Sequence, residues 1–174
     1  MGVVKKLIVV EDRLEQIFAF LPKTVNSKNE EFTPVFMYGN QNELNIFLNT
    51  KRTTSKYPLI WLIYPFEEHH KRTRVELNDI SIVIATETNG VMLNKERMET
   101  SYKKILFPLY DNIRDLFSRA NIMNVDGDFT LFKHPKYSGD DEAIENMAVD
   151  IWDAIKITFS CSITNDCLRL KSKL

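Results

Sequence analysis

The chain has 174 residues, of which 44% are hydrophobic, enough to build one substantial core. We therefore expect a single domain over residues 1–174. Its 23 Lys and Arg residues nearly balance 24 Asp and Glu residues, so the formal net charge is -1. A near-neutral chain has no domain-wide positive field to hold nucleic acid by counterion release, which argues against a dedicated DNA-binding protein.

The N-terminal residues predict an amphipathic helix rather than a signal peptide or a membrane span. The apolar run Leu7–Val10 is followed at once by charged residues and is too short for either alternative. We therefore expect a soluble, unexported chain with no membrane partner. Apolar residues recur at helical steps up to the stop at Pro22: Val3, Leu7, Val10, Leu14, Ile17 and Leu21.

The next segment predicts a strand followed by a short helix. EFTPVFMYG, residues 31–39, is rich in residues that suit strands, and Pro34 indicates an edge strand or a strand start. Asn40 is a plausible N-cap for the helix that follows. That helix would place Leu44, Phe47 and Leu48 on one face.

Two apolar runs, PLIWLIY at 58–64 and DISIVIAT at 79–86, are typical of strands in the middle of a sheet. The linking segment Phe66–Glu76 is almost entirely charged or polar and has no helical pattern. The two strands therefore pair most simply as a long antiparallel hairpin. His69 and His70 then lie near its tip.

The two adjacent histidines favour a contact surface over a chemical site. Neighbours on an extended chain point to opposite faces, so His69 and His70 cannot easily bind one ion together. Charged residues around them keep a protruding hairpin soluble or meet the charges of a partner. We expect an interface at the tip, with no catalytic residue, metal or cofactor, formed by Glu67, Glu68, His69, His70, Lys71, Arg72 and Arg74.

Residues 93–120 carry the longest helical pattern in the chain. Pro108 should kink this helix or open its second half, because proline lacks a backbone donor and crowds the preceding turn. A long bent helix can cover one face of a sheet. Its apolar side is formed by Met98, Tyr102, Ile105, Leu109, Ile113, Leu116 and Phe117.

Residues 121–139 predict irregular structure with a turn at Asp126-Gly127 and a short strand over 129–132. Asp-Gly-Asp is also how some calcium loops begin. Thr130 and Leu131 stand where such a loop needs a further ligand and a glycine, so a tight turn is favoured.

The C-terminal region predicts a capped helix and then a half-buried strand. Ser138 is a candidate cap, and helix-start chemistry explains the acidic residues after it without a magnesium ion: Asp140, Asp141, Glu142 and Glu145. In residues 153–165 one face is apolar: Ile155, Ile157, Phe159, Cys161 and Ile163. Cys161 and Cys167 have no histidines at zinc-site spacing, so we expect free thiols.

The order of elements predicts an α+β fold, with an antiparallel or mixed β-sheet that includes a long hairpin and with helices packed on one face. The chain has no glycine-rich phosphate loop, no G-x-S-x-G, no H-E-x-x-H and no D/E-x-K nuclease motif.

Six segments follow one another along the chain: PVFMYGNQNELNIFLN, YPLIWL, ISIVIATETN, SYKKILFPLYDNI, HPKY and WDAIKITFSCSITN. In this order they resemble the tail-completion (tail terminator) proteins and related head-to-tail joining ring proteins of tailed bacteriophages. The resemblance covers roughly Phe32–Asn165. The segments are similar to those of versions from phages of gut Bacteroidetes, including crAss-like phages.

The resemblance implies a tail-terminator-like fold and a non-enzymatic virion protein that forms a ring, a hexamer or a dodecamer, at the head-tail neck or the top of the tail. DNA would pass through the lumen. Its partners would be copies of itself and neighbouring neck, portal-side or tail-tube proteins, with assembly in the host cytoplasm. Two other functions stay open. One is a small metal-dependent hydrolase or nuclease that uses His69, His70, His134 or the acids near Asp140; the other is a monomeric adaptor or host-directed inhibitor that binds through the hairpin.

Overall fold

The computed structural model describes residues 7–25, 30–49, 57–137 and 151–172. Its helices are α1 (Val10–Phe18), α2 (Gln41–Asn49), α3 (Asn94–Arg97), the π-helical η1 (Met98–Leu106) and α4 (Phe107–Arg119). Its strands are β1 (Thr24–Val25), β2 (Glu31–Phe32), β3 (Val35–Asn40), β4 (Leu59–Tyr64), β5 (Glu67–His70), β6 (Arg74–Thr88), β7 (Met123–Tyr137) and β8 (Ile151–Thr164).

A six-stranded mixed sheet organises the fold. Its order is β3-β4-β6-β8-β7, with β5 pairing to β6 beside this path, while β1 and β2 form a separate two-stranded sheet. β3 and β4 are parallel, and the other pairs of the main sheet are antiparallel. β4 and β5 pair with successive parts of β6, so together they form the predicted long hairpin. The predicted α+β class with a mixed sheet is confirmed.

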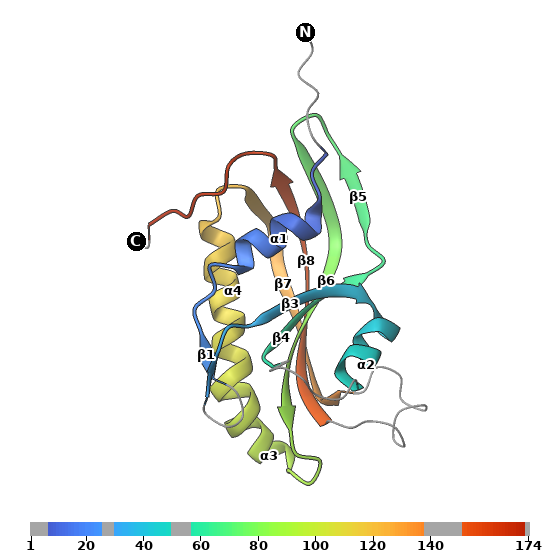
Figure 1. The fold of residues 1–174 in the computed structure, drawn as a ribbon, viewed down its shortest axis with the longest axis vertical. Helices are drawn as coiled ribbons and strands as arrows, with labels where there is room; N and C mark the ends of the chain where they lie inside the picture. The colour runs from blue at the N-terminus through green and yellow to red at the C-terminus, as the bar shows by residue number, and fades with distance from the viewer. Residues whose placement is uncertain (1–6, 26–29, 50–56, 138–150, 173–174) are drawn as a thin grey trace.

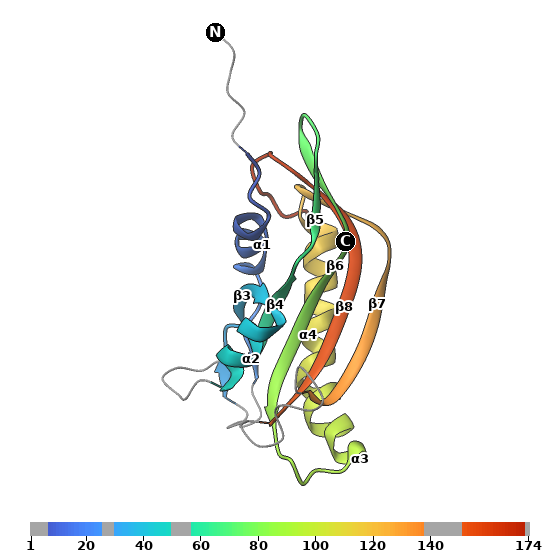
Figure 2. The ribbon, with the colours of Figure 1, turned by 90° about the vertical axis from the view of Figure 1, so that its right-hand side faces the viewer.

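The helices that cover the sheet lie on both of its faces (Figures 1 and 2). α1 and α4 lie over one face, as predicted, on a core to which the strands contribute Ile60, Leu62, Ile82, Ile84, Ile155 and Ile157. α2 departs from the predicted single face and packs on the opposite one, where Leu44 and Leu48 meet Leu59 and Trp61 of β4. Alternate residues of a strand point to opposite faces, so the fully apolar β4 contributes buried side chains to the cores on both faces of the sheet.

The first helix is shorter than the sequence predicts. Val10, Leu14 and Ile17 are buried in α1 as expected, but Leu7 is 68% exposed and lies before the helix. Residues 7–9 alternate between exposed and buried, with Ile8 turned inward, as an extended segment does. The expectation that Leu7 lies on the helical stripe is therefore wrong, and Val3 lies outside the described residues.

The predicted strand and short helix are confirmed as β3 and α2, joined by a capping box. Asn40 Oδ1 accepts a hydrogen bond from the Glu43 amide at 2.9 Å, and Glu43 Oε2 accepts one from the Asn40 amide at 2.7 Å. This reciprocal pair satisfies two amides at the start of α2. It also fixes the sharp change of direction after the edge strand.

We expect Gly39→Ala to lower the free energy of unfolding by about 2–4 kcal/mol through backbone strain and crowding. Gly39 has φ +153, and a Cβ there would lie 2.4 Å from Glu43 Oε2 and 3.0 Å from Trp61 Cζ2. Gly127→Ala is the matched control: its φ is +81 with nothing within 4 Å, so only the strain of about 1–2 kcal/mol applies. Urea denaturation measures both variants, and equal losses would contradict the role of crowding.

The predicted long helix is present and changes its hydrogen-bond register next to Pro108. Helical structure is continuous through α3, η1 and α4. The Phe107 amide donates to the carbonyl oxygen of Tyr102, five residues back, at the end of the π-helical stretch. Pro108 follows in the first turn of α4, where its missing donor coincides with the change of register. The residues of the predicted apolar face are buried, except for the partly buried Met98.

The prediction of irregular structure over residues 121–139 is wrong, because residues 123–137 form the long strand β7. The pairing of β7 with β8 shifts register between Asp126 and Thr130, and Gly127 has a positive φ of 81. Asp126-Gly127 therefore lies in a bulge within the strand rather than in a chain-reversing turn. The predicted helix after Ser138 and its acidic residues lie outside the described residues.

β8 confirms the predicted alternating strand. The five residues of its predicted apolar face are buried, and the intervening residues from Lys156 to Thr164 are half-buried on the other face. Burial raises the pKa of the Cys161 thiol to about 12. Cys161 and the exposed Cys167 are both free thiols, as expected.

Candidate functional site

The predicted interface lies at the closed end of the hairpin formed by β5 and β6. β5 pairs with β6 from Glu67 opposite Asn78 to His70 opposite Val75. The Lys71 amide donates to the carbonyl oxygen of Arg74 at 2.8 Å and closes the turn. The tip reaches beyond the helices at one end of the molecule (Figures 1 and 2). His69 and His70 end β5 and so lie near the tip, as predicted.

The two histidines belong to opposite faces of the hairpin. His70 Nε2 lies 2.6 Å from Glu68 Oε2, while His69 Nε2 lies 3.6 Å from Glu67 Oε1. Each histidine thus meets the acid two residues before it, the neighbour on its own face of the strand. The expectation that the two imidazoles do not converge is confirmed.

Two of the three basic residues of the tip, Lys71 and Arg74, are paired with one carboxylate. Glu76 accepts ion pairs from Lys71 Nζ and from Arg74, each at 2.6 Å. These hydrogen bonds lower the pKa of the Glu76 carboxyl, so its stabilising effect is present above the usual glutamate pKa and is lost as the pH falls through the lowered value. Arg72 has no hydrogen bond or ion pair among the described residues, so the tip presents an unpaired cation to solvent.

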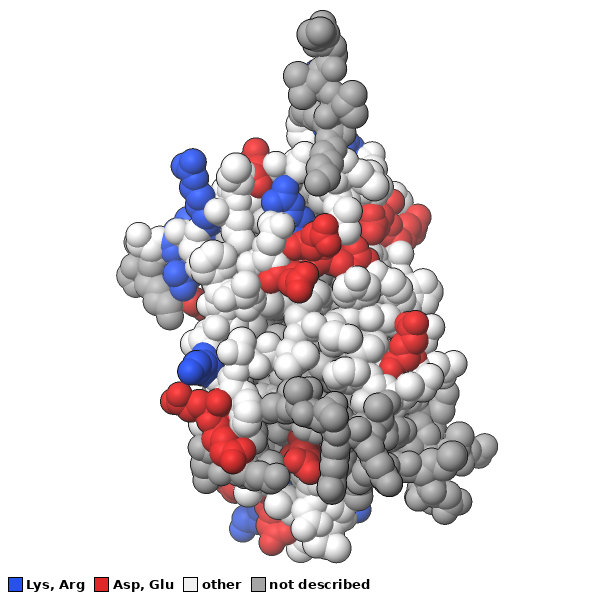
Figure 3. All heavy atoms as spheres, viewed as in Figure 1, with Lys and Arg blue, Asp and Glu red and all other residues white. Residues whose placement is uncertain are grey.

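Acidic side chains gather beside the hairpin, over α1 and toward β5 (Figure 3). Asp12 and Glu15 are exposed on α1. Glu11 accepts a hydrogen bond from the Tyr64 hydroxyl, which joins α1 to the end of β4. Burial and this hydrogen bond raise the pKa of the Tyr64 phenol. The surface around the candidate interface therefore has basic side chains at the hairpin tip and acidic side chains over α1.

His134, the third histidine, lies far from the other two along the sheet. It pairs with Ala154 near the start of β8, whereas Val75, the partner of His70, pairs with Ile163 near its end. At 3.3 Å per residue, these positions on β8 are roughly 30 Å apart. Burial, with the nearby charge of Lys156, lowers the pKa of the His134 imidazole. The structure does not bring the three histidines together, and the acids near Asp140 lie outside the described residues.

A buried ion pair that the sequence patterns did not reveal joins the long helix to the sheet. Arg97 Nη1 lies 2.7 Å from Asp153 Oδ1, and the two side chains are 1% and 0% exposed. Arg97 also donates to the carbonyl oxygens of Asn89 at 2.6 Å and Met92 at 3.1 Å. The same Asp153 oxygen accepts the Lys136 amide at 3.2 Å. Arg97 thus links the loop after β6 to β8, and Asp153 links β8 to the end of β7.

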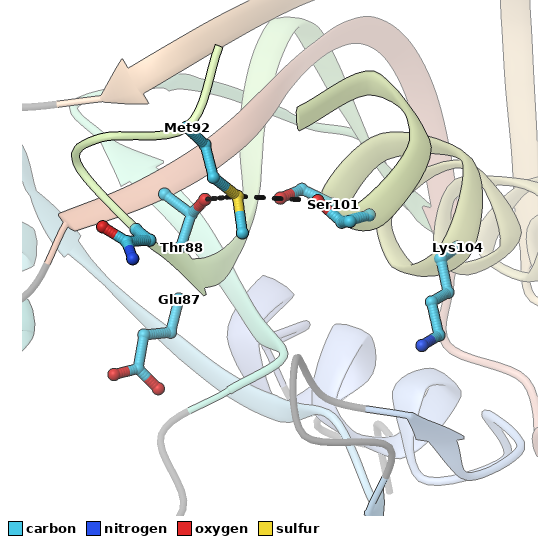
Figure 4. Close-up of a pocket in the computed structure, with 7 residues that line it drawn as sticks. Glu87, Thr88, Met92, Ser101 and Lys104 are labelled. Carbon is cyan, nitrogen blue, oxygen red and sulfur yellow. Dashed lines mark hydrogen bonds between the residues drawn. The ribbon is translucent and has the colours of Figure 1, made fainter. Parts of the chain in front are cut away.

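A small cavity of about 280 Å³ lies between the end of β6 and η1 (Figure 4). The Met92 sulfur accepts weak hydrogen bonds from the hydroxyls of Thr88 at 3.6 Å and Thr100 at 3.7 Å. Its ionisable side chains, Glu87 and Lys104, come from β6 and η1 and lie on different sides of it. Among the described residues that line it, the cavity has hydroxyl, amide and charged groups but no histidine or cysteine. The lining residues are Glu87, Thr88, Asn89, Met92, Thr100, Ser101 and Lys104.

In the parts of the chain that the structure describes, no three His, Cys, Asp or Glu side chains are grouped so that they could hold a metal ion. None of the helices in those parts has the length and apolar composition needed to cross a membrane. No protein-family model matches the chain, and no curated protein matches its sequence.

Proposed function

We propose that this chain is a structural virion protein that forms a ring at the head-tail neck or the top of the tail of a tailed bacteriophage, with DNA passing through the lumen. The observation that supports this best is the charged hairpin tip. It reaches beyond the helices, and its histidines belong to opposite faces. Such a tip suits electrostatic contact with another protein surface, here the next ring or a neighbouring neck protein.

The shape of the sheet supports association into a ring. Its two outer strands, β3 and β7, lie on opposite sides of the molecule and differ in length and direction (Figure 2). Head-to-tail association needs two different surfaces on one subunit, and it gives a ring when the rotation between subunits closes. The net charge of -1 is compatible with a lumen along which DNA slides rather than binds.

The native mass of the purified protein over a concentration series, with negative-stain images of the same samples, tests the proposal. We expect closed six-fold or twelve-fold rings at the higher concentrations. A monomer at every concentration would overturn the proposal. That result would favour the monomeric adaptor, which would use the same hairpin tip to hold one heterologous partner.

A further inference from the structure

The segment that follows β8 is held in a fixed conformation against the end of α4. The Asn121 amide donates to the carbonyl oxygen of Arg169 at 3.1 Å, and the Lys171 amide donates to that of Arg119 at 3.0 Å. The Asn121 side chain also donates to the carbonyl oxygen of Cys167 at 3.1 Å. These bonds flank an antiparallel bridge between Ala120 and Leu170, so the side chains of this segment have defined directions.

Two cations of this segment point outward together. Leu168 and Leu170 pack against the core, so the alternating Arg169 and Lys171 lie on the outer side, where both are exposed. Neither cationic side chain has a partner among the described residues. We call Arg119, Arg169 and Lys171 the basic strip.

The strip stays positive after the two acids near it in the sequence are counted. Arg119 is paired with Asp115 at 3.1 Å and donates to the carbonyl oxygen of Lys171 at 2.9 Å. The carboxylate of Asp166 accepts a hydrogen bond from the Thr164 hydroxyl at 2.9 Å. That hydrogen bond does not neutralise Asp166, so Arg169 and Lys171 place two unpaired cations against one carboxylate and leave the surface positive.

A second surface carries the opposite charge. Asp12 and Glu15 lie one helical turn apart on α1, are exposed and have no side-chain partner among the described residues. Arg13 is turned to Asn165 at 2.8 Å and Gln16 at 3.1 Å, so it neutralises neither acid through an ion pair. The surface continues onto β5 at Glu68, which lies near Tyr64 as Glu11 does, and we call it the acidic patch: Glu11, Asp12, Glu15 and Glu68.

We propose that the basic strip of one copy docks on the acidic patch of the next copy, an inference that rests on the proposed ring. In Figure 3 the acids lie over α1 and β5, and basic side chains lie at the left margin, where Figure 1 places the C-terminal segment. Because the two surfaces are different parts of the subunit, a contact between them is heterologous and leaves one free surface of each kind for the next subunit. The charges set orientation and association rate, and Leu7 and Val9, 68% and 41% exposed, add apolar area beside α1.

Two charge-reversal variants test this contact. The first carries Arg169→Glu and Lys171→Glu, and the second carries Asp12→Lys and Glu15→Lys. Either variant alone presents like charges across the contact, so we expect self-association at low salt to weaken by more than about tenfold. An equimolar mixture restores opposite charges at every contact and should form rings in which the two variants alternate. Native mass spectrometry measures both results, and added salt should reduce the differences.

Lys95→Glu is the matched control, because it reverses an exposed cation on α3, outside both surfaces and the hairpin tip, and should leave the ring intact. Restored assembly in the mixture also shows that both variants are folded. Assembly of either variant alone like the wild type, or a mixture that fails to recover, would overturn the inference. If the wild type still forms rings in that case, the proposed function stands. Wild-type dimers that use this contact but never close would support the inference and overturn the ring, and a wild-type monomer under all conditions would overturn both.

Discussion

Arg97→Met is expected to lower the free energy of unfolding by about 3–5 kcal/mol, because it leaves the carboxylate of Asp153 buried without its cation. The loss has a second source. The carbonyl oxygens of Asn89 and Met92 would also lose the donors that Arg97 supplies. Urea denaturation at neutral pH, followed by circular dichroism and by tryptophan fluorescence, measures the loss and checks that unfolding stays cooperative.

Arg119→Met is the matched control, since it makes the same chemical change in the ion pair with Asp115, whose side chains are 25% and 42% exposed. Water already solvates that pair, so the expected loss is below about 1 kcal/mol. The double variant Arg97→Met with Asp153→Leu should recover part of the stability, because it removes both buried charges together. Equal losses of unfolding free energy in Arg97→Met and Arg119→Met would show that the buried ion pair stabilises the fold no more than the exposed one.

The buried ion pair also bears on how this end of the molecule keeps its shape. Arg97 fixes the loop that carries Val91 and Leu93, which are 83% and 71% exposed. Thr88, which accepts a hydrogen bond from Arg97 at 3.3 Å, also lines the small cavity. Loss of Arg97 should therefore loosen this loop and the cavity before it affects the hairpin at the opposite end of the sheet.

Strong local periodicity explains which parts of the fold could be predicted. β8 alternates without a break from Ile155 to Ile163, and the apolar runs of β4 and β6 flank a charged segment, so the strands and their hairpin followed from pattern alone. The capping box at Asn40 is equally local, because both of its partners lie within one turn. In each case the residues that decide the structure are close together in the sequence.

The features that were missed depend on partners distant in sequence. Asp126-Gly127 has the local form of a turn, but pairing with β8 keeps the chain extended as β7 and reduces the turn signal to a bulge. Asp153 shares the phase of the buried Ile155 and Ile157, which is a usable sign of a buried polar partner. That partner, Arg97, is 56 residues away, and no local pattern could identify it.

The candidate site likewise has parts that a local sequence pattern predicted and parts that depend on distant partners. The position of His69 and His70 near a hairpin tip, and their separation onto two faces, followed from strand alternation and agree with the structure. The basic strip was not predicted, although the alternating Leu-Arg-Leu-Lys of residues 168–171 was its signal. The meaning of that short pattern depends on the bonds that dock it against Asn121. Whether the tip is an interface stays a prediction.

Phe117→Ala should also lower the free energy of unfolding strongly, by about 3–5 kcal/mol, because it opens a cavity where the sheet and two helices meet. The Phe117 side chain is 1% exposed. Its ring centroid lies 5.6 Å from that of Phe18 on α1 and 5.4 Å from that of Phe159 on β8. Phe132→Ala is the control, since Phe132 is 53% exposed on β7, and its loss should stay below about 1 kcal/mol. Similar losses in the two variants would contradict this packing role.

Phe117 also links the stability of the fold to the proposed contact between copies. Phe18 lies in the last turn of α1, and α1 carries Asp12 and Glu15 of the acidic patch. We therefore expect Phe117→Ala to speed hydrogen exchange of the α1 amides more than Arg97→Met does, since Arg97 lies at the opposite end of the long helix. Assembly should weaken in the same order at concentrations where both variants remain folded. If α1 exchanged at the wild-type rate in Phe117→Ala, the contact with Phe18 would not be what holds α1, and its acidic patch, in place.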